Sequence, residues 1–222
     1  MRGGEIFKNR ILKLNSLFIF VIRIEHDGSI YTPYHFLEIS KKIGQYFDLQ
    51  KIMIEKRFQK FSKSDYKFSI NLSSFELSNE QFRKFLIDKI DEYNIAEKLI
   101  IEILEDEEFQ NEELMGYLIF LHNLDIEFAI DDFGSGHSNL SYLLTKLPVS
   151  ILKIDGSLIK NIERNENNCK LVKALTNMVK IFDLSIVAEF VENEKIAEIL
   201  RDLGIDYLQG YYFSKPKNIE EI

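Results

Sequence analysis

The stretch of sequence most informative about the fold reads Ala129-Ile130-Asp131-Asp132-Phe133-Gly134-Ser135-Gly136-His137-Ser138. An apolar run that ends in two carboxylates and a glycine-rich turn is typical of a strand and the loop that follows it. Two adjacent aspartates suit two divalent cations, because one carboxylate can bind both ions while its neighbour binds one. They also suit an ordinary strand exit and helix cap, so the segment alone leaves both interpretations open.

The chain on either side of this segment alternates short apolar runs with amphipathic segments, which is typical of strand–helix units on a parallel sheet. Strands are predicted over Leu17–Ile24, Lys67–Leu72, Lys98–Leu104, Ile126–Asp131, Val149–Ile154, Leu184–Glu189 and Ile205–Leu208. Helices are predicted over Gln50–Phe61, Asn79–Tyr93, Glu112–Leu124, Asn167–Phe182 and Glu194–Leu203. A further strand is placed within Glu5–Leu14.

This order of elements fits either an open doubly wound sheet or a closed (β/α)8-type barrel. The sequence favours the barrel, because no G-x-G-x-x-G or P-loop pattern follows the first strand. Carboxylates also recur at the carboxyl ends of several strands, where a barrel gathers its active site. Linkers and low-complexity tracts are absent from the sequence, so we predict a single α/β domain over residues 1–222.

Composition excludes several classes of function. The 222 residues carry a net charge of −8, which argues against binding a nucleic-acid polymer, because such proteins present a basic face. The single Cys169 forms neither an intrachain disulfide nor a thiolate cluster, and no secretory leader opens the chain, so a cytoplasmic location is expected. The longest apolar run, Leu17–Ile22, is far shorter than the roughly 20 residues of a membrane helix, so no membrane segment is expected.

Polar residues recur in or just after the predicted strands. They are Asn71, Glu102, Asp131, Asp132, Lys153, Glu189 and Glu192. A charge at the end of an apolar strand is costly to bury unless it is paired, hydrogen-bonded or bound to a metal. Oxygen ligands without a His or Cys cluster indicate Mg²⁺ or Mn²⁺ and not zinc. The pattern predicts metal-assisted hydrolysis of a phosphate ester.

Seven short motifs carry a resemblance to a known family. They are Asn71-Leu72-Ser73, Glu102-Ile103-Leu104-Glu105, Asp131-Asp132-Phe133-Gly134-Ser135-Gly136, Leu147-Pro148-Val149, Lys153-Ile154-Asp155, Ala188-Glu189-Phe190-Val191-Glu192 and Gln209-Gly210-Tyr211. Their succession resembles the ordered signature of EAL domains from Arg23 to Pro216. The resemblance implies a modified (β/α)8, TIM-like barrel that hydrolyses cyclic di-GMP, a bacterial second messenger, to its linear dinucleotide pGpG with two metal ions.

The resemblance also implies a role for each matching residue. The metal ligands are Asn71, Glu102, Asp131, Asp132 and Glu189, and the catalytic residues are Lys153, Glu189, Glu192 and Gln209. Arg23, Gly210 and Tyr211 contact cyclic di-GMP, and Glu105 braces the loop of Gly134, Ser135 and Gly136, which links metal binding to the contacts of a homodimer. Lys153 orients the attacking water or stabilises charge on phosphorus, and Glu189 is a ligand or a base. Glu192 and Gln209 support the ligand shell through hydrogen bonds.

Three departures from the family pattern leave the activity open. The family's strand Glu-Ala-Leu-x-Arg, aligned on Arg23, places Ile19 where the glutamate ligand belongs. Residues 1–16 form an abbreviated amino-terminal segment without a counterpart of a Tyr-Gln-Pro motif, and Phe190 replaces a glycine. The chain is therefore either a phosphodiesterase that tolerates the loss or an inactive domain that captures cyclic di-GMP or a protein partner. An unrelated barrel enzyme acting on another phosphoester explains the ordered motifs poorly.

Overall fold

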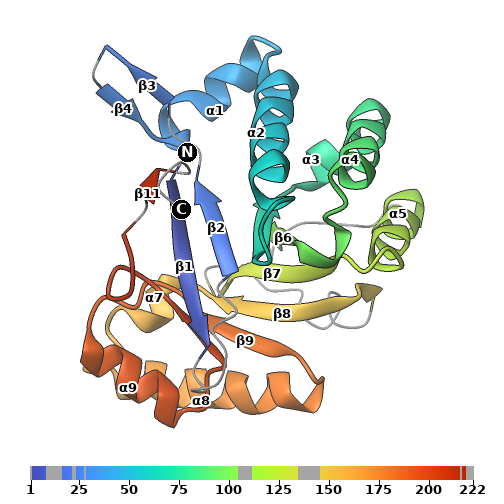
Figure 1. The fold of residues 1–222 in the computed structure, drawn as a ribbon. Coiled ribbons are helices and arrows are strands. Elements are labelled where there is room, and N and C mark those ends of the chain that lie inside the picture. Colours follow the sequence, from blue (N-terminus) through green and yellow to red (C-terminus); the bar gives the residue numbers. More distant parts are fainter. Residues whose placement is uncertain are drawn as a thin grey trace.

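The described residues form seven parallel strands, and several of them lie side by side in Figure 1. This computed structural model describes residues 2–8, 17–21, 24–27, 29–104, 112–134, 146–215 and 217–218. In order of pairing the strands are β2 (Leu17–Val21), β5 (Lys67–Asn71), β6 (Leu99–Leu104), β7 (Glu127–Phe133), β8 (Val149–Ile154), β9 (Ser185–Ala188) and β10 (Tyr207–Gln209). All seven predicted strands are confirmed, with ends that differ by a few residues.

An antiparallel strand completes the sheet. β1 (Arg2–Lys8) runs antiparallel to β2 on one side and to β10 on the other, so it connects the two edges of the parallel sheet. The short β11 (Lys217–Asn218) pairs with the start of β1. A regular (β/α)8 barrel has only parallel strands, so the structure supports a TIM-barrel-like parallel sheet and not the regular form. The strand predicted within Glu5–Leu14 begins earlier, at Arg2, and residues 9–16 lie outside the described residues.

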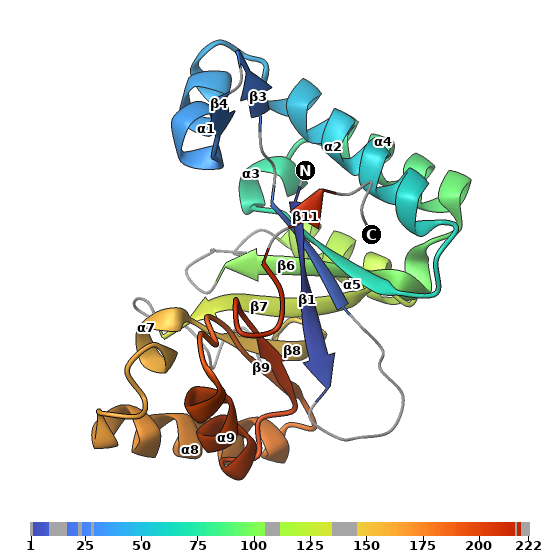
Figure 2. The same ribbon diagram turned by 60° about the vertical axis from the view of Figure 1, so that its left-hand side comes forward.

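The helices lie on the outside of the sheet (Figures 1 and 2). The five predicted helices are confirmed as α2 (Tyr46–Phe61), α4 (Glu80–Tyr93), α5 (Glu112–His122), α8 (Glu166–Ile181) and α9 (Glu194–Asp202). In α8 the buried Val172, Leu175 and Val179 recur at helical spacing and face the core. Within the described residues, the structure contains no helix that is both long and apolar enough to span a membrane.

Several shorter elements were not predicted. The predicted strand Leu17–Ile24 is too long, because β2 ends at Val21 and Ile24 opens a separate hairpin of β3 (Ile24–His26) and β4 (Ser29–Tyr31). Asp27 adopts a left-handed φ of 48° in its turn, as Asp-Gly hairpins require. The helix α1 (Pro33–Lys42) follows with proline at its first position. Short helices α3 (Ser74–Leu77), η1 (Ala96–Lys98) and α7 (Gly156–Ile159) complete the fold.

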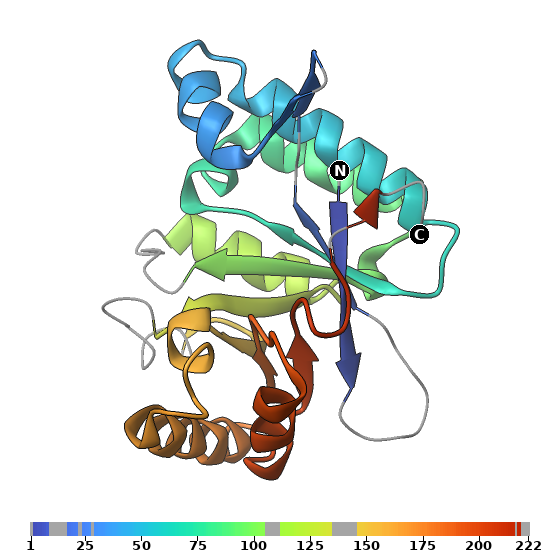
Figure 3. The ribbon, with the colours of Figure 1, turned by 90° about the vertical axis from the view of Figure 1, so that its left-hand side faces the viewer.

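The direction of the parallel strands positions the candidate site. Figure 3 shows β6 and β7 running side by side towards the region of α7. Because all seven strands are parallel, their carboxyl ends meet at one edge of the sheet. On the face of the sheet that carries the site residues, Ile100, Ala129 and Val187 form a buried apolar cluster beneath the strand ends. A polar residue at the carboxyl end of a strand therefore lies directly above this apolar cluster.

Candidate active site

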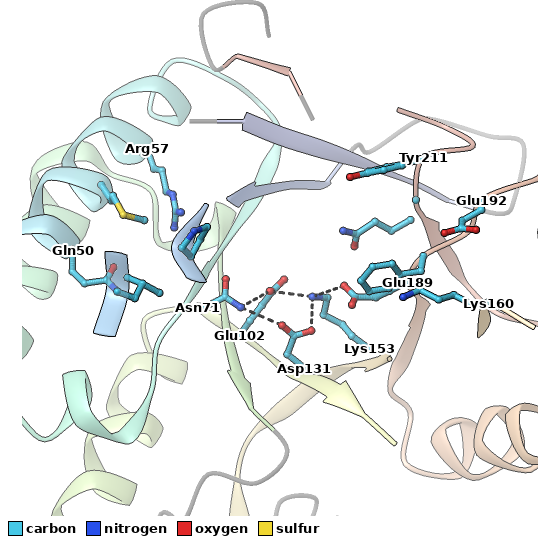
Figure 4. Close-up of a pocket in the computed structure, with 16 residues that line it drawn as sticks. Gln50, Arg57, Asn71, Glu102, Asp131, Lys153, Lys160, Glu189, Glu192 and Tyr211 are labelled. Carbon is cyan, nitrogen blue, oxygen red and sulfur yellow. Dashed lines mark hydrogen bonds and ion pairs between the residues drawn. The ribbon is translucent and has the colours of Figure 1, made fainter. Parts of the chain in front are cut away.

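Five of the predicted site residues converge at the carboxyl ends of neighbouring strands. Asn71 is the last residue of β5, Glu102 and Asp131 lie in the second halves of β6 and β7, Lys153 lies near the end of β8, and Glu189 follows β9. The main-chain register places Asn71 level with Glu102 on the adjacent strand. Figure 4 shows the five side chains pointing toward one another from these strands.

Lys153 is the centre of this cluster. Its Nζ lies 3.0 Å from Glu102 Oε2, 2.6 Å from Asp131 Oδ1 and 2.9 Å from Glu189 Oε1. Asn71 Nδ2 donates to Glu102 Oε2 at 3.1 Å and to Asp131 Oδ2 at 3.2 Å. Lys153 and Glu102 are almost completely buried. Three carboxylates therefore share one ammonium group, and the ionised cluster has an excess of negative charge.

This imbalance perturbs the acidity of the cluster. Burial lowers the pKa of Lys153, but the attraction of Glu102, Asp131 and Glu189 outweighs it, so the pKa of Lys153 lies well above its usual value. Burial raises the pKa of Glu102, which Lys153 offsets only in part. Burial likewise raises the pKa of Glu189 to about 7, with Lys153 opposing the rise and Asp131 adding to it. The carboxylates therefore favour the arrival of another positive charge.

The donor atoms fit a divalent cation. Carboxylate oxygens of Asp131, Asp132 and Glu189 lie within 4.8 Å of one another. Glu102 Oε1 is buried without a hydrogen-bond donor among the described residues, although the nearby Ser69 hydroxyl lowers the pKa of Glu102. Such an oxygen is costly unless a cation or water meets it. An all-oxygen donor set of this kind suits Mg²⁺ or Mn²⁺ chemistry.

The backbone after Asp131 explains how two successive aspartates reach one cluster. Adjacent residues of a strand normally face opposite sides of the sheet. Asp132 adopts a left-handed φ of 55°, which aspartate tolerates better than most residues and which interrupts the alternation. Gly134 follows in the predicted loop, but Glu105, Ser135 and Gly136 lie outside the described residues. The bracing contact of Glu105 therefore stays a prediction.

The loop after β9 is held against the end of β10. Val191 N donates to Gln209 O at 2.9 Å. A Cβ atom at Gly210 would lie 2.2 Å from Val191 O, so only glycine allows this close approach. The contact brings four predicted residues to the wall of one pocket: Glu192, Gln209, Gly210 and Tyr211. Glu192 and Tyr211 are exposed there, and neither belongs to the hydrogen-bonded cluster around Lys153 in the described residues.

The pocket has a volume of about 550 Å³ and includes residues that the sequence did not single out as site residues. These are Pro33, Leu37, Gln50, Met53, Arg57, Lys160 and Phe190. Of these, Phe190 had a sequence signal, since it replaces a glycine of the family pattern. The predicted ligand contact Arg23 lies outside the described residues. Arg57 and Lys160 are therefore the cations that the described structure adds to the pocket wall beside Lys153.

Arg57 is an unusual component of this wall. It projects from α2 with only 4% of its surface exposed, and Figure 4 shows it on the side of the pocket where Asn71 and Glu102 lie. Burial lowers the pKa of Arg57 to about 10, although the charge of Glu102 opposes the change. The negative charge of Glu102 therefore stabilises the ionised form of this buried guanidinium.

Comparison with known proteins identifies the family. The model of the EAL domain family matches residues 17–216. The chain belongs to the EAL domain family. Its EAL domain is 34% identical over 206 residues to the probable cyclic di-GMP phosphodiesterase PdeA of Escherichia coli, covering 90% of this chain and 28% of that protein. It is 40% identical over 154 residues to the cyclic di-GMP phosphodiesterase PdeA of Borreliella burgdorferi, covering 68% of this chain and 23% of the relative.

Solved structures share the fold of this EAL domain. An EAL domain protein from Listeria monocytogenes matches with a TM-score of 0.85 at 26% identity, covering 99% of this chain and 89% of the other. The EAL enzyme Bd1971, in a form bound to cAMP and cyclic di-GMP, matches with a TM-score of 0.90 at 22% identity, covering 99% of this chain and 62% of the other. The chain spans less than a third of the length of the two curated relatives.

Proposed function

We propose that this EAL domain binds cyclic di-GMP and hydrolyses one phosphodiester bond to give the linear dinucleotide. The observation that carries the proposal is the convergence of Asn71, Glu102, Asp131, Lys153 and Glu189 in one pocket at the strand ends. The names of the relatives from Escherichia coli and Borreliella burgdorferi support the same ligand and reaction.

Mg²⁺ or Mn²⁺ is the proposed cofactor. Asp131, Asp132 and Glu189 would hold one ion. Asn71, Glu102 and Asp131 would hold a second ion. When bound, a divalent cation withdraws charge from a phosphate and promotes the ionisation of water. Support comes from the spacing of the three carboxylates and from the buried Glu102 oxygen that lacks a donor among the described residues.

The residues of the chain have distinct parts in the proposed reaction. Lys153 orients Glu102, Asp131 and Glu189 and places a positive charge beside the phosphate, where charge develops during attack. The oxygen of water bonds to phosphorus as the bond from phosphorus to a ribose oxygen breaks. Glu189 accepts a proton from the water and later releases it to solvent, and the departing ribose oxygen takes up a proton from solvent. Glu192 and Gln209 at the pocket wall hold water and ligand by hydrogen bonds.

Arg57 provides a first prediction. Arg57→Met keeps the length and the apolar part of this buried side chain but removes its charge, so the affinity for cyclic di-GMP should fall about 10-fold, the scale of one hydrogen bond to a charged group. Calorimetric titration measures the change. The matched control is Arg164→Met, because the Arg164 side chain is 84% exposed and does not line the pocket. Equal losses in both variants would contradict a local role for Arg57.

The same proposal includes the finer features implied by family membership. They are a modified (β/α)8 barrel, a single domain over residues 1–222, a homodimer, a cytoplasmic location and roles for Arg23, Gly210, Tyr211 and the loop braced by Glu105. The connection of β2 and β10 through β1 supports the barrel. The placement of Gly210 and Tyr211 on the pocket wall supports their ligand contact.

Product analysis tests the proposed function. The protein is incubated with cyclic di-GMP and Mn²⁺ or Mg²⁺, and the nucleotides are separated by ion-exchange chromatography. We expect the linear dinucleotide in the presence of metal and none in chelator. Binding of cyclic di-GMP without any product would instead identify a receptor, and the absence of both binding and product would overturn the proposal.

A further inference from the structure

Phe190 occupies a strained position in the wall of the pocket. It follows Glu189 of the carboxylate cluster and adopts a left-handed φ of 54°. That conformation is unfavourable for a bulky side chain, and such residues persist where the surrounding structure enforces them. The neighbours Glu189 and Val191 are buried, whereas 45% of the surface of Phe190 is exposed. The ring of Phe190 is therefore partly open in the pocket that it lines.

The ring of Phe190 packs against the turn that carries Gly156 and Lys160. A Cβ atom at Gly156 would lie 2.3 Å from Phe190 Cδ2, so the ring occupies space that any other residue at position 156 would fill. Lys160 Nζ lies 4.2 Å from the centroid of the same ring. Lys160 N donates to Gly156 O at 2.9 Å, so Gly156 at the start of α7 and Lys160 directly after its end belong to one helical turn. The ring therefore lies across this turn.

The arrangement makes an aromatic surface beside charged groups. Phe190 and Lys160 line the same pocket as Glu189 and Gln209, so the exposed part of the ring borders the proposed ligand. An ammonium group over one face of an aromatic ring attracts its π electrons. This leaves the opposite face better suited to an electron-rich aromatic partner, and nucleic-acid bases stack on such rings.

We propose that Phe190, supported by Gly156 and Lys160, is a stacking shelf for a purine base of the bound nucleotide. The inference rests on the proposed function, because it assigns the shelf to one guanine of cyclic di-GMP. The base lies on the open face of Phe190 while the phosphate of the same nucleotide reaches the cluster around Lys153. Phe190 thus determines which ligands the pocket accepts, and it takes no part in bond cleavage.

The shelf is tested with a cyclic dinucleotide that carries 2-aminopurine in place of one guanine. Stacking on an aromatic ring quenches the fluorescence of this base. Phe190→Leu retains an apolar side chain at the same backbone position but removes the ring. We expect its affinity to fall at least about 5-fold, the lower end of base–aromatic stacking, and the quenching to be lost. The Michaelis constant for cyclic di-GMP should rise by a larger factor than the turnover number falls. The matched control Phe182→Leu, at a 49% exposed position outside the pocket, should retain affinity and quenching.

The outcomes separate the shelf from the proposed function. If wild-type protein hydrolyses cyclic di-GMP and Phe190→Leu keeps its affinity and quenching, the shelf is wrong and the function stands. If wild-type protein neither binds nor hydrolyses cyclic di-GMP, the function is wrong, and 2-aminopurine riboside monophosphate becomes the probe. If wild-type protein quenches that nucleotide and Phe190→Leu does not, the shelf is supported. If wild-type protein does not quench it, or if Phe190→Leu quenches it equally, the shelf is wrong.

Discussion

Replacing Lys153 with methionine should abolish most hydrolysis of cyclic di-GMP and destabilise the metal-free protein. The variant removes the ammonium group that contacts Glu102, Asp131 and Glu189, all of which are buried. Loss of a group that stabilises developing charge lowers the turnover number by about 10²–10³-fold. Removing one partner of a buried ion pair lowers the free energy of unfolding by about 3–5 kcal/mol, because the other charge stays buried without compensation. Urea denaturation in chelator and initial rates in Mn²⁺ measure the two effects.

The control for Lys153→Met is Lys67→Met. Lys67 forms an ion pair of 2.8 Å with Glu127, but both side chains are more than a third exposed. Removing an exposed pair changes the free energy of unfolding by no more than about 1 kcal/mol. Added Mn²⁺ should restore part of the stability of Lys153→Met, because a cation can replace the lost charge, and should leave Lys67→Met unchanged. Wild-type stability and turnover in Lys153→Met would show that the ammonium group is not the centre of the site.

Introducing glutamate at position 19 should strengthen the site. The register places Ile19 of β2 level with Ser69 of β5, two residues before Asn71, which is about 7 Å along a strand. A carboxylate introduced at this position supplies the anionic ligand that the family pattern has and this chain lacks. We expect Ile19→Glu to bind Mn²⁺ more tightly and to hydrolyse cyclic di-GMP about 10–100-fold faster, the scale of changes in a ligand shell. Calorimetry and initial rates measure the gain.

Two further variants isolate the effect of the new carboxylate. Ile19→Gln has nearly the same shape as Ile19→Glu without its charge, so it should gain much less metal affinity. Asp131→Asn combined with Ile19→Glu should abolish the gain, because Asp131 bonds to both Asn71 and Lys153 at the centre of the cluster. If Ile19→Glu folds but changes neither metal affinity nor turnover, the alignment of β2 on Arg23 is wrong.

The parallel strands and the convergence of the site were predictable from the sequence. Apolar runs such as Val149–Ile154 predict strands locally, and intervening helices predict that the strands run parallel. The meeting of Glu102, Asp131 and Lys153 then follows, since parallel strands end at one edge of the sheet. The hydrogen-bonded cluster in the structure agrees with this expectation.

Other features depend on contacts between distant segments, which a single sequence does not encode locally. The antiparallel direction of β1 is decided by its pairing with β10, from the other end of the chain. The burial of Arg57 depends on which side of α2 faces the pocket. The position of an arginine within a helical segment does not reveal this side from the sequence alone. The support of Phe190 requires that Gly156 approach it from α7. Local patterns identify Phe190 as a departure from the family pattern. They do not show that its side chain packs against the turn of α7.

The most direct test of the account compares the wild-type protein with Asp131→Asn for formation of the linear dinucleotide, with Mn²⁺ present and with folding and cyclic di-GMP binding measured in parallel. Asp131 bonds to Asn71 and Lys153 and belongs to the group of carboxylates that fits a cation, so its charge is central to the proposed reaction. We predict that wild-type protein forms the linear dinucleotide and that the folded Asp131→Asn variant forms none. Equal product from both proteins, or cyclic di-GMP left intact by the wild type, would contradict the account.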